Sequence, residues 1–126
     1  MMPWLFVASG GALGAVLRFY ITAYLYPVAG DRFPFGTLLA NVVGCFLVAL
    51  LYVVIVEKAM LPAYWRHLLI TGFLGALTTF STFSLDALLL WQNGAPALAI
   101  YYVLATLVLC LLAVTAAWYL VSFVLS

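Results

Sequence analysis

Long apolar runs separated by short polar interruptions dominate this chain of 126 residues. Four such runs can be marked off, at about residues 3–27, 35–56, 68–92 and 97–124. Each has roughly the 20 residues that a helix needs to cross a hydrocarbon core of about 30 Å. The pattern predicts an all-α membrane protein, with a single four-helix transmembrane domain over residues 1–126 and almost nothing outside the bilayer.

The interruptions between the runs are short. Two linkers, at residues 28–34 and 57–66, and a turn at residues 93–96 carry most of the proline and charge, together with Gly30 and Gly94. The first run could be mistaken for a secretory signal, but it has no basic start and exceeds the usual length of a signal core. We therefore expect it to be retained as a transmembrane helix.

Composition supports a membrane protein and excludes other classes. The chain is 70% hydrophobic and 6% charged, which is too little polar surface to coat a soluble globule. Its net charge of +1 offers no basic patch for phosphates, so no nucleic acid partner is expected. Cys45 and Cys110 lie inside apolar runs, which predicts free thiols rather than a disulfide or a metal site.

The positive charges are balanced between the two sides of the membrane. With four spans, both termini share one side with Lys58 and Arg66, and the opposite side carries Arg18 and Arg32. Because loop Lys/Arg bias sets membrane orientation, a balanced chain can insert both ways round. Dual insertion predicts an antiparallel homodimer with its two-fold axis in the membrane plane. The alternative is that a single residue such as Arg66 decides the orientation.

Glycines in the first three spans predict close contacts between helices. Gly10 and Gly14 have a Gly-xxx-Gly spacing, and Gly44, Gly72 and Gly75 add further points of close approach. The glycine run in the first span is not a dinucleotide-binding fingerprint, because no strand precedes it.

Polar side chains within the first two spans have two interpretations each. Arg18 lies about 22 Å along the first span, so it can be an interfacial anchor or can draw an anion into a vestibule. Asn41 follows Thr37 by one turn, so a polar stripe begins where the second helix enters the membrane. The Asn41 amide can bond a neighbouring helix or offer its hydrogens to a ligand.

The third span contains the densest polar cluster. Phe80 and Phe83 are three residues apart and project from one side of a helix. Such aromatic pairs usually pack in a core, but Thr78 and Thr79 beside Gly75 have the composition of a helix that breaks. Broken membrane helices persist where the freed backbone groups coordinate an ion or line a cavity. The five hydroxyl side chains of the cluster are Thr78, Thr79, Ser81, Thr82 and Ser84.

Two more polar stripes adjoin this cluster. The stripe on the third span contains Thr79, Thr82 and Asp86. The stripe on the fourth span contains Tyr102, Thr106 and Cys110, at four-residue steps. A cation route would need carboxylates or carbonyls, and the only acid within a span is Asp86, near a span end. The donors and the electron-poor ring edges favour a small anion.

Three segments together resemble the CrcB/Fluc family of fluoride channels. They are GGALGA followed by Arg18, FGTLLANVVG from Phe35, and GFLGALTTFSTF from Gly72. The resemblance covers three of the four spans, and the Gly-x-x-Gly-x-x-Thr-Thr-Phe-Ser-Thr-Phe run is a specific signature. It implies a passive fluoride channel, selective over chloride, formed by an antiparallel dual-topology homodimer with two pores in the cell inner membrane.

The resemblance also implies roles for individual residues. Asn41 reaches into the pore, and Phe80 and Phe83 form an aromatic box whose ring edges meet fluoride. The backbone carbonyls of Gly75 and Thr78, two from each subunit, hold a structural sodium ion. The family's basic vestibule residue corresponds to Arg18. Together with the polar stripes, these matches give the candidate fluoride pore as Asn41, Phe80, Phe83, Ser81, Thr82, Thr79, Tyr102, Thr106, Cys110 and Thr37.

The chain departs from the family in its fourth span, where Thr106 and Cys110 stand at positions that are commonly serine. Asp86 stands where Glu is frequent. Two other functions remain open: a small dual-topology multidrug or cation antiporter, and a non-conducting membrane scaffold. The antiporter needs an intramembrane carboxylate to exchange protons, and the first span has none. We expect no enzymatic activity.

Overall fold

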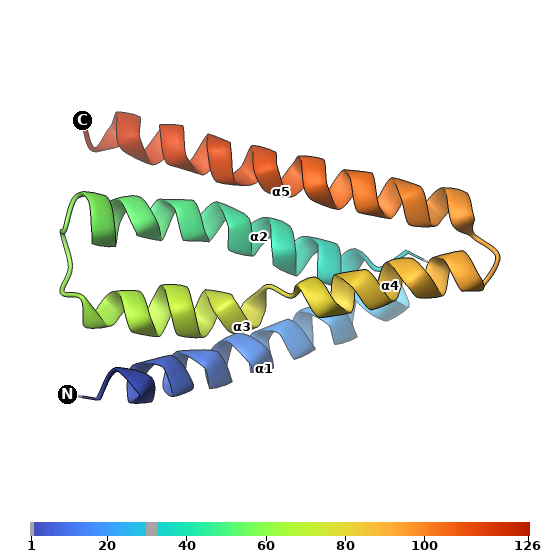
Figure 1. Ribbon diagram of the computed structural model, residues 1–126, viewed down its shortest axis with the longest axis horizontal. Helices are drawn as coiled ribbons and strands as arrows, with labels where there is room; N and C mark the ends of the chain where they lie inside the picture. The colour runs from blue at the N-terminus through green and yellow to red at the C-terminus, as the bar shows by residue number, and fades with distance from the viewer. Residues whose placement is uncertain (1, 30–32) are drawn as a thin grey trace.

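The computed structural model describes residues 2–29 and 33–126, without the side chains of residues 25–29. The described chain consists of helices and their connections and contains no strand (Figure 1). Its elements are α1 Pro3–Ala29, α2 Phe35–Tyr52, η1 Val53–Glu57, η2 Arg66–Leu74, α3 Gly75–Leu77, α4 Phe80–Gln92 and α5 Pro96–Val124. Gly30, Asp31 and Arg32 lie outside the described residues, so the side of the membrane expected for Arg32 stays a prediction.

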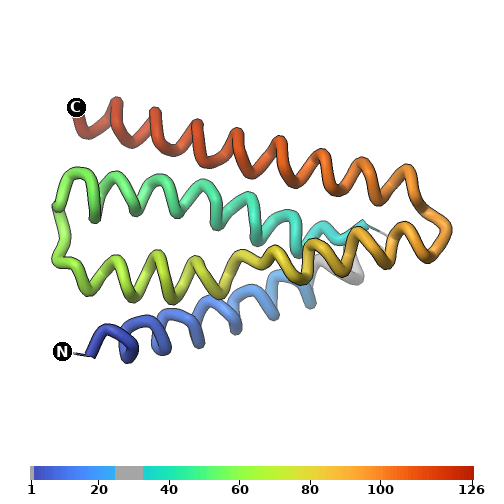
Figure 2. Tube along the Cα trace, in the orientation of Figure 1, coloured from blue at the N-terminus to red at the C-terminus, as the bar shows by residue number. Residues whose placement is uncertain are grey.

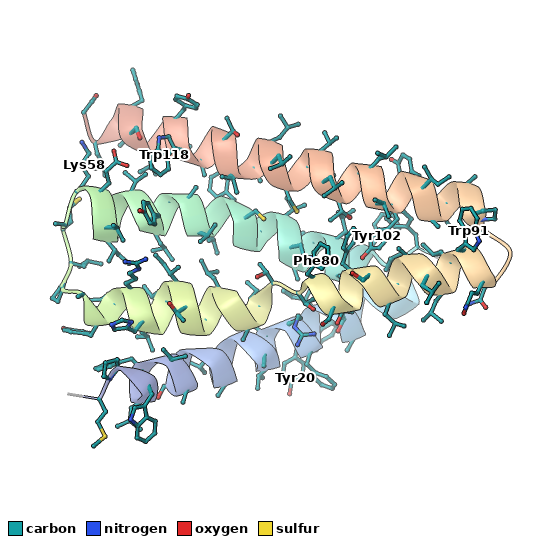
Figure 3. The ribbon with its side chains drawn as sticks, in the orientation of Figure 1. Tyr20, Lys58, Phe80, Trp91, Tyr102 and Trp118 are labelled. Atoms are coloured by element: carbon teal, nitrogen blue, oxygen red, sulfur yellow. The ribbon has the colours of Figure 1, made fainter. Side chains whose placement is uncertain are left out.

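The helices form an up-and-down bundle of membrane-spanning length. Four helical stretches of the described chain are long and apolar enough to cross a bilayer: Pro3–Tyr24, Phe35–Glu57, Arg66–Gln92 and Pro96–Val124. Figure 2 shows the chain passing back and forth along the bundle, with both termini at the same end. Lys58 lies at this end too (Figure 3). The protein is therefore a multi-pass membrane protein, as its apolar pattern predicts.

The first and third spans are in direct backbone contact. A Cβ added at Gly10 would lie 2.0 Å from the Leu68 carbonyl oxygen, and one added at Gly72 would lie 2.6 Å from the Val7 oxygen. No other residue fits such a spacing, so the predicted packing role of these glycines is confirmed. Gly75 differs, because a Cβ there would meet only Ile70 of its own helix, at 3.7 Å. The expected close approach at Gly75 is therefore wrong within one copy of the chain.

Two segments of the spans are π-helical, a feature that the sequence pattern did not predict. They are η1, at the end of the second span, and η2, at the start of the third. A π-helix has wider turns and i→i+5 hydrogen bonds, and it is rare beyond a single turn. Helix α1 packs along η2.

The third span is interrupted near its middle. Helix α3 ends at Leu77 and α4 begins at Phe80, and the two residues between them are extended. Thr78 has φ −83° and ψ 152°, and Thr79 has φ −152° and ψ 122°. Thr79 also caps α4, because its Oγ1 accepts a hydrogen bond of 3.1 Å from the Thr82 N–H. The direction of the span is kept across the interruption (Figure 1).

Buried side chains gather on both sides of this interruption. One cluster, around Phe83, Leu90 and Tyr102, lies between α4 and α5. The other, around Ala40, Leu74 and Leu77, lies between α2 and the first half of the third span. Most other large apolar side chains are exposed, as expected for a surface that faces lipid.

Candidate functional site

The interruption at Thr78 and Thr79 is held by an asparagine of the second span. The Asn41 Nδ2 donates a hydrogen bond of 3.1 Å to the Thr79 carbonyl oxygen, and the Thr79 N–H donates one of 2.8 Å to Asn41 Oδ1. Asn41 is buried. Its amide therefore pairs with both backbone groups of one extended residue, which is the neighbouring-helix role considered for it. A primary amide carries two N–H donors, so a second acceptor can still be bound.

Arg18 of α1 contacts the same interruption from another side. Its Nε donates a hydrogen bond of 3.0 Å to the Ala76 carbonyl oxygen, in the last turn of α3. Arg18 also lines a cavity described below, so a vestibule position is compatible with the structure. Its bond to the third span is a contact that neither sequence-based interpretation included.

Several carbonyl groups at the interruption have lost the donors that a continuous helix would give them, and those of Gly75 and Thr78 are two of them. The Thr79 N–H, which would reach Gly75, goes to Asn41 instead. The Thr82 N–H, which would reach Thr78, goes to the Thr79 hydroxyl. Gly75 is exposed on the surface of the chain, whereas Thr78 is half-buried against Gly44. These two oxygens can therefore accept another partner.

The two phenylalanines after the interruption have different surroundings. Their ring centroids are 5.5 Å apart, so they touch as the three-residue spacing predicts. Phe83 is only 6% exposed and packs against Tyr102 at 5.2 Å, whereas Phe80 is 75% exposed. In Figure 3, Phe80 and Tyr102 lie at neighbouring positions along the bundle, close to the interruption. One ring therefore belongs to the core and the other to the surface.

A cavity of about 580 Å³ opens beside the second half of the third span. It brings together polar side chains from three different spans, and Asn93 of the last turn also lines it. The polar residues from the spans are Arg18, Thr22, Thr37, Thr82 and Asp86. The Tyr102 hydroxyl donates a hydrogen bond of 3.2 Å to the Asp86 carboxylate, and Thr37 lies beside the same carboxylate. The cavity is lined further by Phe33, an aromatic residue just before α2 that the sequence analysis did not single out. The sequence does contain a signal for Phe33, because it stands beside Pro34 and Phe35 at the entry to the second span.

The remaining predicted residues lie near the interruption or along α5. The Ser81 hydroxyl is exposed and lies 3.3 Å from the Thr79 hydroxyl. Thr106 is 5% exposed, and its Oγ1 has no hydrogen-bond partner among the described residues. Cys110 is half-buried beside Cys45, and both are free thiols. Thr106 and Cys110 do not line the cavity, so the α5 stripe leads away from it.

A metal ion bound by side chains finds no support in the described part of the chain. It contains no group of three or more His, Cys, Asp and Glu side chains that could hold one. A cation at this site would have to be held by backbone oxygens, which are the ligands that hard cations accept.

Comparison with known proteins identifies the family. The family model described as "CrcB-like protein, Camphor Resistance (CrcB)" matches residues 5–118. A protein of Saccharophagus degradans named "Fluoride-specific ion channel FluC" is 54% identical over 117 residues, which are 93% of this chain and 87% of that protein. Proteins with the same name from Hahella chejuensis and Agrobacterium fabrum are 50% and 44% identical, over 88% and 87% of this chain and 87% and 88% of their own lengths. The chain belongs to the CrcB family.

Proposed function

We propose that this protein is a passive, fluoride-selective ion channel of the inner membrane that lowers cytoplasmic fluoride. The name of its relatives supports the substrate. The observation that carries the proposal is the buried Thr106 hydroxyl, which has no partner in the described part of the chain and lies on the same helix face as Tyr102. A buried orphan donor is rare in proteins, and a small anion that passes it would satisfy it.

The proposed fluoride path uses donors and aromatic ring edges. Arg18 lies at the vestibule, and the cavity supplies Thr37 and Thr82. The second N–H of the Asn41 amide and the hydroxyls of the third span continue the path, and Phe80 and Phe83 present their ring edges. The path then follows Tyr102, Thr106 and Cys110 along α5. Asp86 already accepts a hydrogen bond from Tyr102, so its carboxylate belongs to the wall rather than to the anion's contacts.

The proposed channel is an antiparallel dual-topology homodimer. Phe80 is 75% exposed and Gly75 is exposed, although both lie at the most polar part of the third span. A second copy would cover this surface and would complete the aromatic box. The balanced Lys and Arg count supports insertion in both orientations.

A structural sodium ion fits the same interface. The Gly75 and Thr78 carbonyls have lost their helical donors, and Gly75 faces outward. Two such carbonyls from each of two copies would supply four oxygens to a hard cation on the two-fold axis. Bound there, sodium would supply positive charge that stabilises the freed carbonyls and joins the two copies.

A passive pore is sufficient for the proposed role. Neutral hydrogen fluoride crosses bilayers and ionises in the less acidic cytoplasm, where the anion accumulates. An inside-negative potential contributes about 2.3 kcal/mol per charge per 100 mV and drives fluoride out through an open pore. No energy-coupling residue or catalytic step is needed. The antiporter alternative is disfavoured because α1 contains no acid.

Fluoride efflux from proteoliposomes tests the proposal. Vesicles loaded with potassium fluoride should release fluoride when a potassium ionophore is added, as read by a fluoride electrode. Vesicles loaded with potassium chloride should retain chloride under the same treatment, and a proton gradient should not change the fluoride rate beyond its effect on voltage. Folded protein that releases no fluoride would support the scaffold alternative instead.

The aromatic pair gives a first prediction. Phe80→Ile and Phe83→Ile should each reduce fluoride flux to background, because isoleucine has no ring edge to meet the anion. The swap roughly preserves volume, so it should cost about 1.5 kcal/mol of stability or less. Phe123→Ile, at a 79% exposed ring near the end of α5, is the matched control and should conduct normally. Normal flux in both pore variants would contradict the aromatic-box assignment.

Thr106 gives a second prediction, in which stability and flux separate. Thr106→Val keeps the shape and removes the hydroxyl without a partner, so the protein should be equally stable or more stable by about 1 kcal/mol. Its fluoride flux should nevertheless fall. Thr115→Val is the matched control on the same helix, because the exposed Thr115 hydroxyl only donates to the Leu111 carbonyl. If Thr106→Val conducted fluoride at the wild-type rate, the assignment of Thr106 to the fluoride path would be wrong.

A further inference from the structure

We propose that Arg18 is a positioning residue. Its Nε–H, rather than its charge in the vestibule, is the group that matters, because it holds the end of α3 so that the Gly75 and Thr78 carbonyls face the sodium site. This inference rests on the proposed function.

The hydrogen bond itself is the first part of the argument. In a continuous helix the Ala76 carbonyl would accept from the Phe80 N–H, but Phe80 begins a new helix. Arg18 Nε takes that place, at 3.0 Å. The end of a helix carries partial negative charge, so a guanidinium there is a charge-assisted donor at membrane depth.

The approach of α1 to the third span is the second part. Gly10, Gly14 and Arg18 are spaced four residues apart and therefore share one face of α1. A Cβ at Gly14 would lie 2.1 Å from the Phe73 carbonyl oxygen, so the two backbones touch one turn before Arg18. This contact sets how far the Arg18 side chain must reach. It delivers Nε, the nitrogen nearest the backbone, to the carbonyl.

The third part of the argument is that hydrogen bonds hold the interruption from both sides. Asn41 of α2 holds the backbone groups of Thr79, and Arg18 of α1 holds the carbonyl of Ala76. The interruption is thus fixed at both of its ends by different spans. Successive helical residues are about 100° apart around the axis. Fixing the Ala76 carbonyl toward α1 therefore also fixes the direction of the neighbouring Gly75 carbonyl.

Two replacements separate the hydrogen bond from the charge. Arg18→Lys keeps the charge and the Lys/Arg balance that sets orientation, but it has no Nε–H. Arg18 replaced with citrulline, through ligation of an N-terminal peptide, keeps the Nε–H and loses the charge. If the charge of Arg18 attracts anions, the lysine protein should conduct fluoride faster than the citrulline protein. If the Nε–H of Arg18 positions the third span, the citrulline protein should conduct fluoride faster.

The experiment measures fluoride flux and the thermal stability of the purified dimer, both as functions of sodium concentration. For Arg18→Lys we expect flux to fall about tenfold or more and the sodium needed for half-maximal stabilisation to rise about tenfold, the effect of losing a charge-assisted hydrogen bond. The citrulline protein should lie closer to wild type on both measures. Arg66→Lys is the matched control, at an exposed arginine, and should behave as wild type.

Several outcomes would overturn the inference. The first is a fluoride flux of the lysine protein that equals or exceeds that of the citrulline protein. The second is a sodium dependence of thermal stability that is the same as in wild type for both proteins. The third is failure of both proteins to form dimers. Assembly of the citrulline protein alone would support it. Failure of the proposed function is separate, because it would appear as absent fluoride flux in wild type and in Arg66→Lys, and sodium-dependent stability would still be measurable.

Discussion

Asn41→Leu is expected to abolish fluoride flux and to destabilise the folded protein by roughly 2–6 kcal/mol. Leucine is similar in size but cannot bond to the backbone. The Thr79 N–H and carbonyl, which now bond to Asn41 at 2.8 and 3.1 Å, would both lose this partner. Neither can return to helical bonding without remaking the extended conformation of Thr78 and Thr79.

Asn41→Asp separates the two hydrogen bonds by which Asn41 clamps Thr79, because it removes the bond that Asn41 donates and keeps the bond that it accepts. An ionised aspartate can still accept from the Thr79 N–H but cannot donate to the Thr79 carbonyl, and its charge would be buried, so the stability should fall below that of wild type. Denaturation in detergent measures the stability, and hydrogen exchange at the Thr79 amide reports on the clamp directly. If the Thr79 amide of Asn41→Leu exchanged as slowly as in wild type, the clamp would not hold the interruption.

The sequence predicts the spans well because the bilayer imposes one requirement on all of them. A hydrocarbon core of about 30 Å requires about 20 apolar residues, and four such runs are visible by inspection. The glycine contacts are predictable for a similar reason, since small residues at four-residue spacing let helices approach. Gly10 and Gly72 confirm this. The cluster at residues 78–84 is also visible, because polar groups are expensive in lipid.

The partners of the polar groups could not be predicted from the sequence. Asn41 and Arg18 bond to backbone atoms of Thr79 and Ala76, and every residue type has the same backbone acceptor. No sequence pattern marks which carbonyl is used across such separations. The different exposures of Phe80 and Phe83 have a related cause, because they depend on how α4 is rotated after the interruption. The π-helical start of the third span, which packs along α1, also has no mark in the sequence pattern.

Gly14→Ala and Gly11→Ala are expected to have opposite effects on stability, although they are the same substitution three residues apart. Alanine favours a helix over glycine by up to about 1 kcal/mol, so this term stabilises both variants. At Gly11 the new Cβ would meet only the Gly72 carbonyl, at an ordinary 3.8 Å. Gly11→Ala should therefore be neutral or slightly stabilising and should conduct normally.

At Gly14 the new Cβ would lie 2.1 Å from the Phe73 carbonyl oxygen and 3.2 Å from the Leu77 nitrogen. Both are backbone atoms, so α1 must move away by about 1 Å to restore van der Waals contact. Overpacking of this kind costs about 1–3 kcal/mol, which exceeds the helix-propensity gain. The movement also draws Arg18, on the same face, away from Ala76, so fluoride flux should fall by about tenfold or more. Equal stability and flux in the two alanine variants would show that the contact between α1 and the third span can relax without disturbing the interruption.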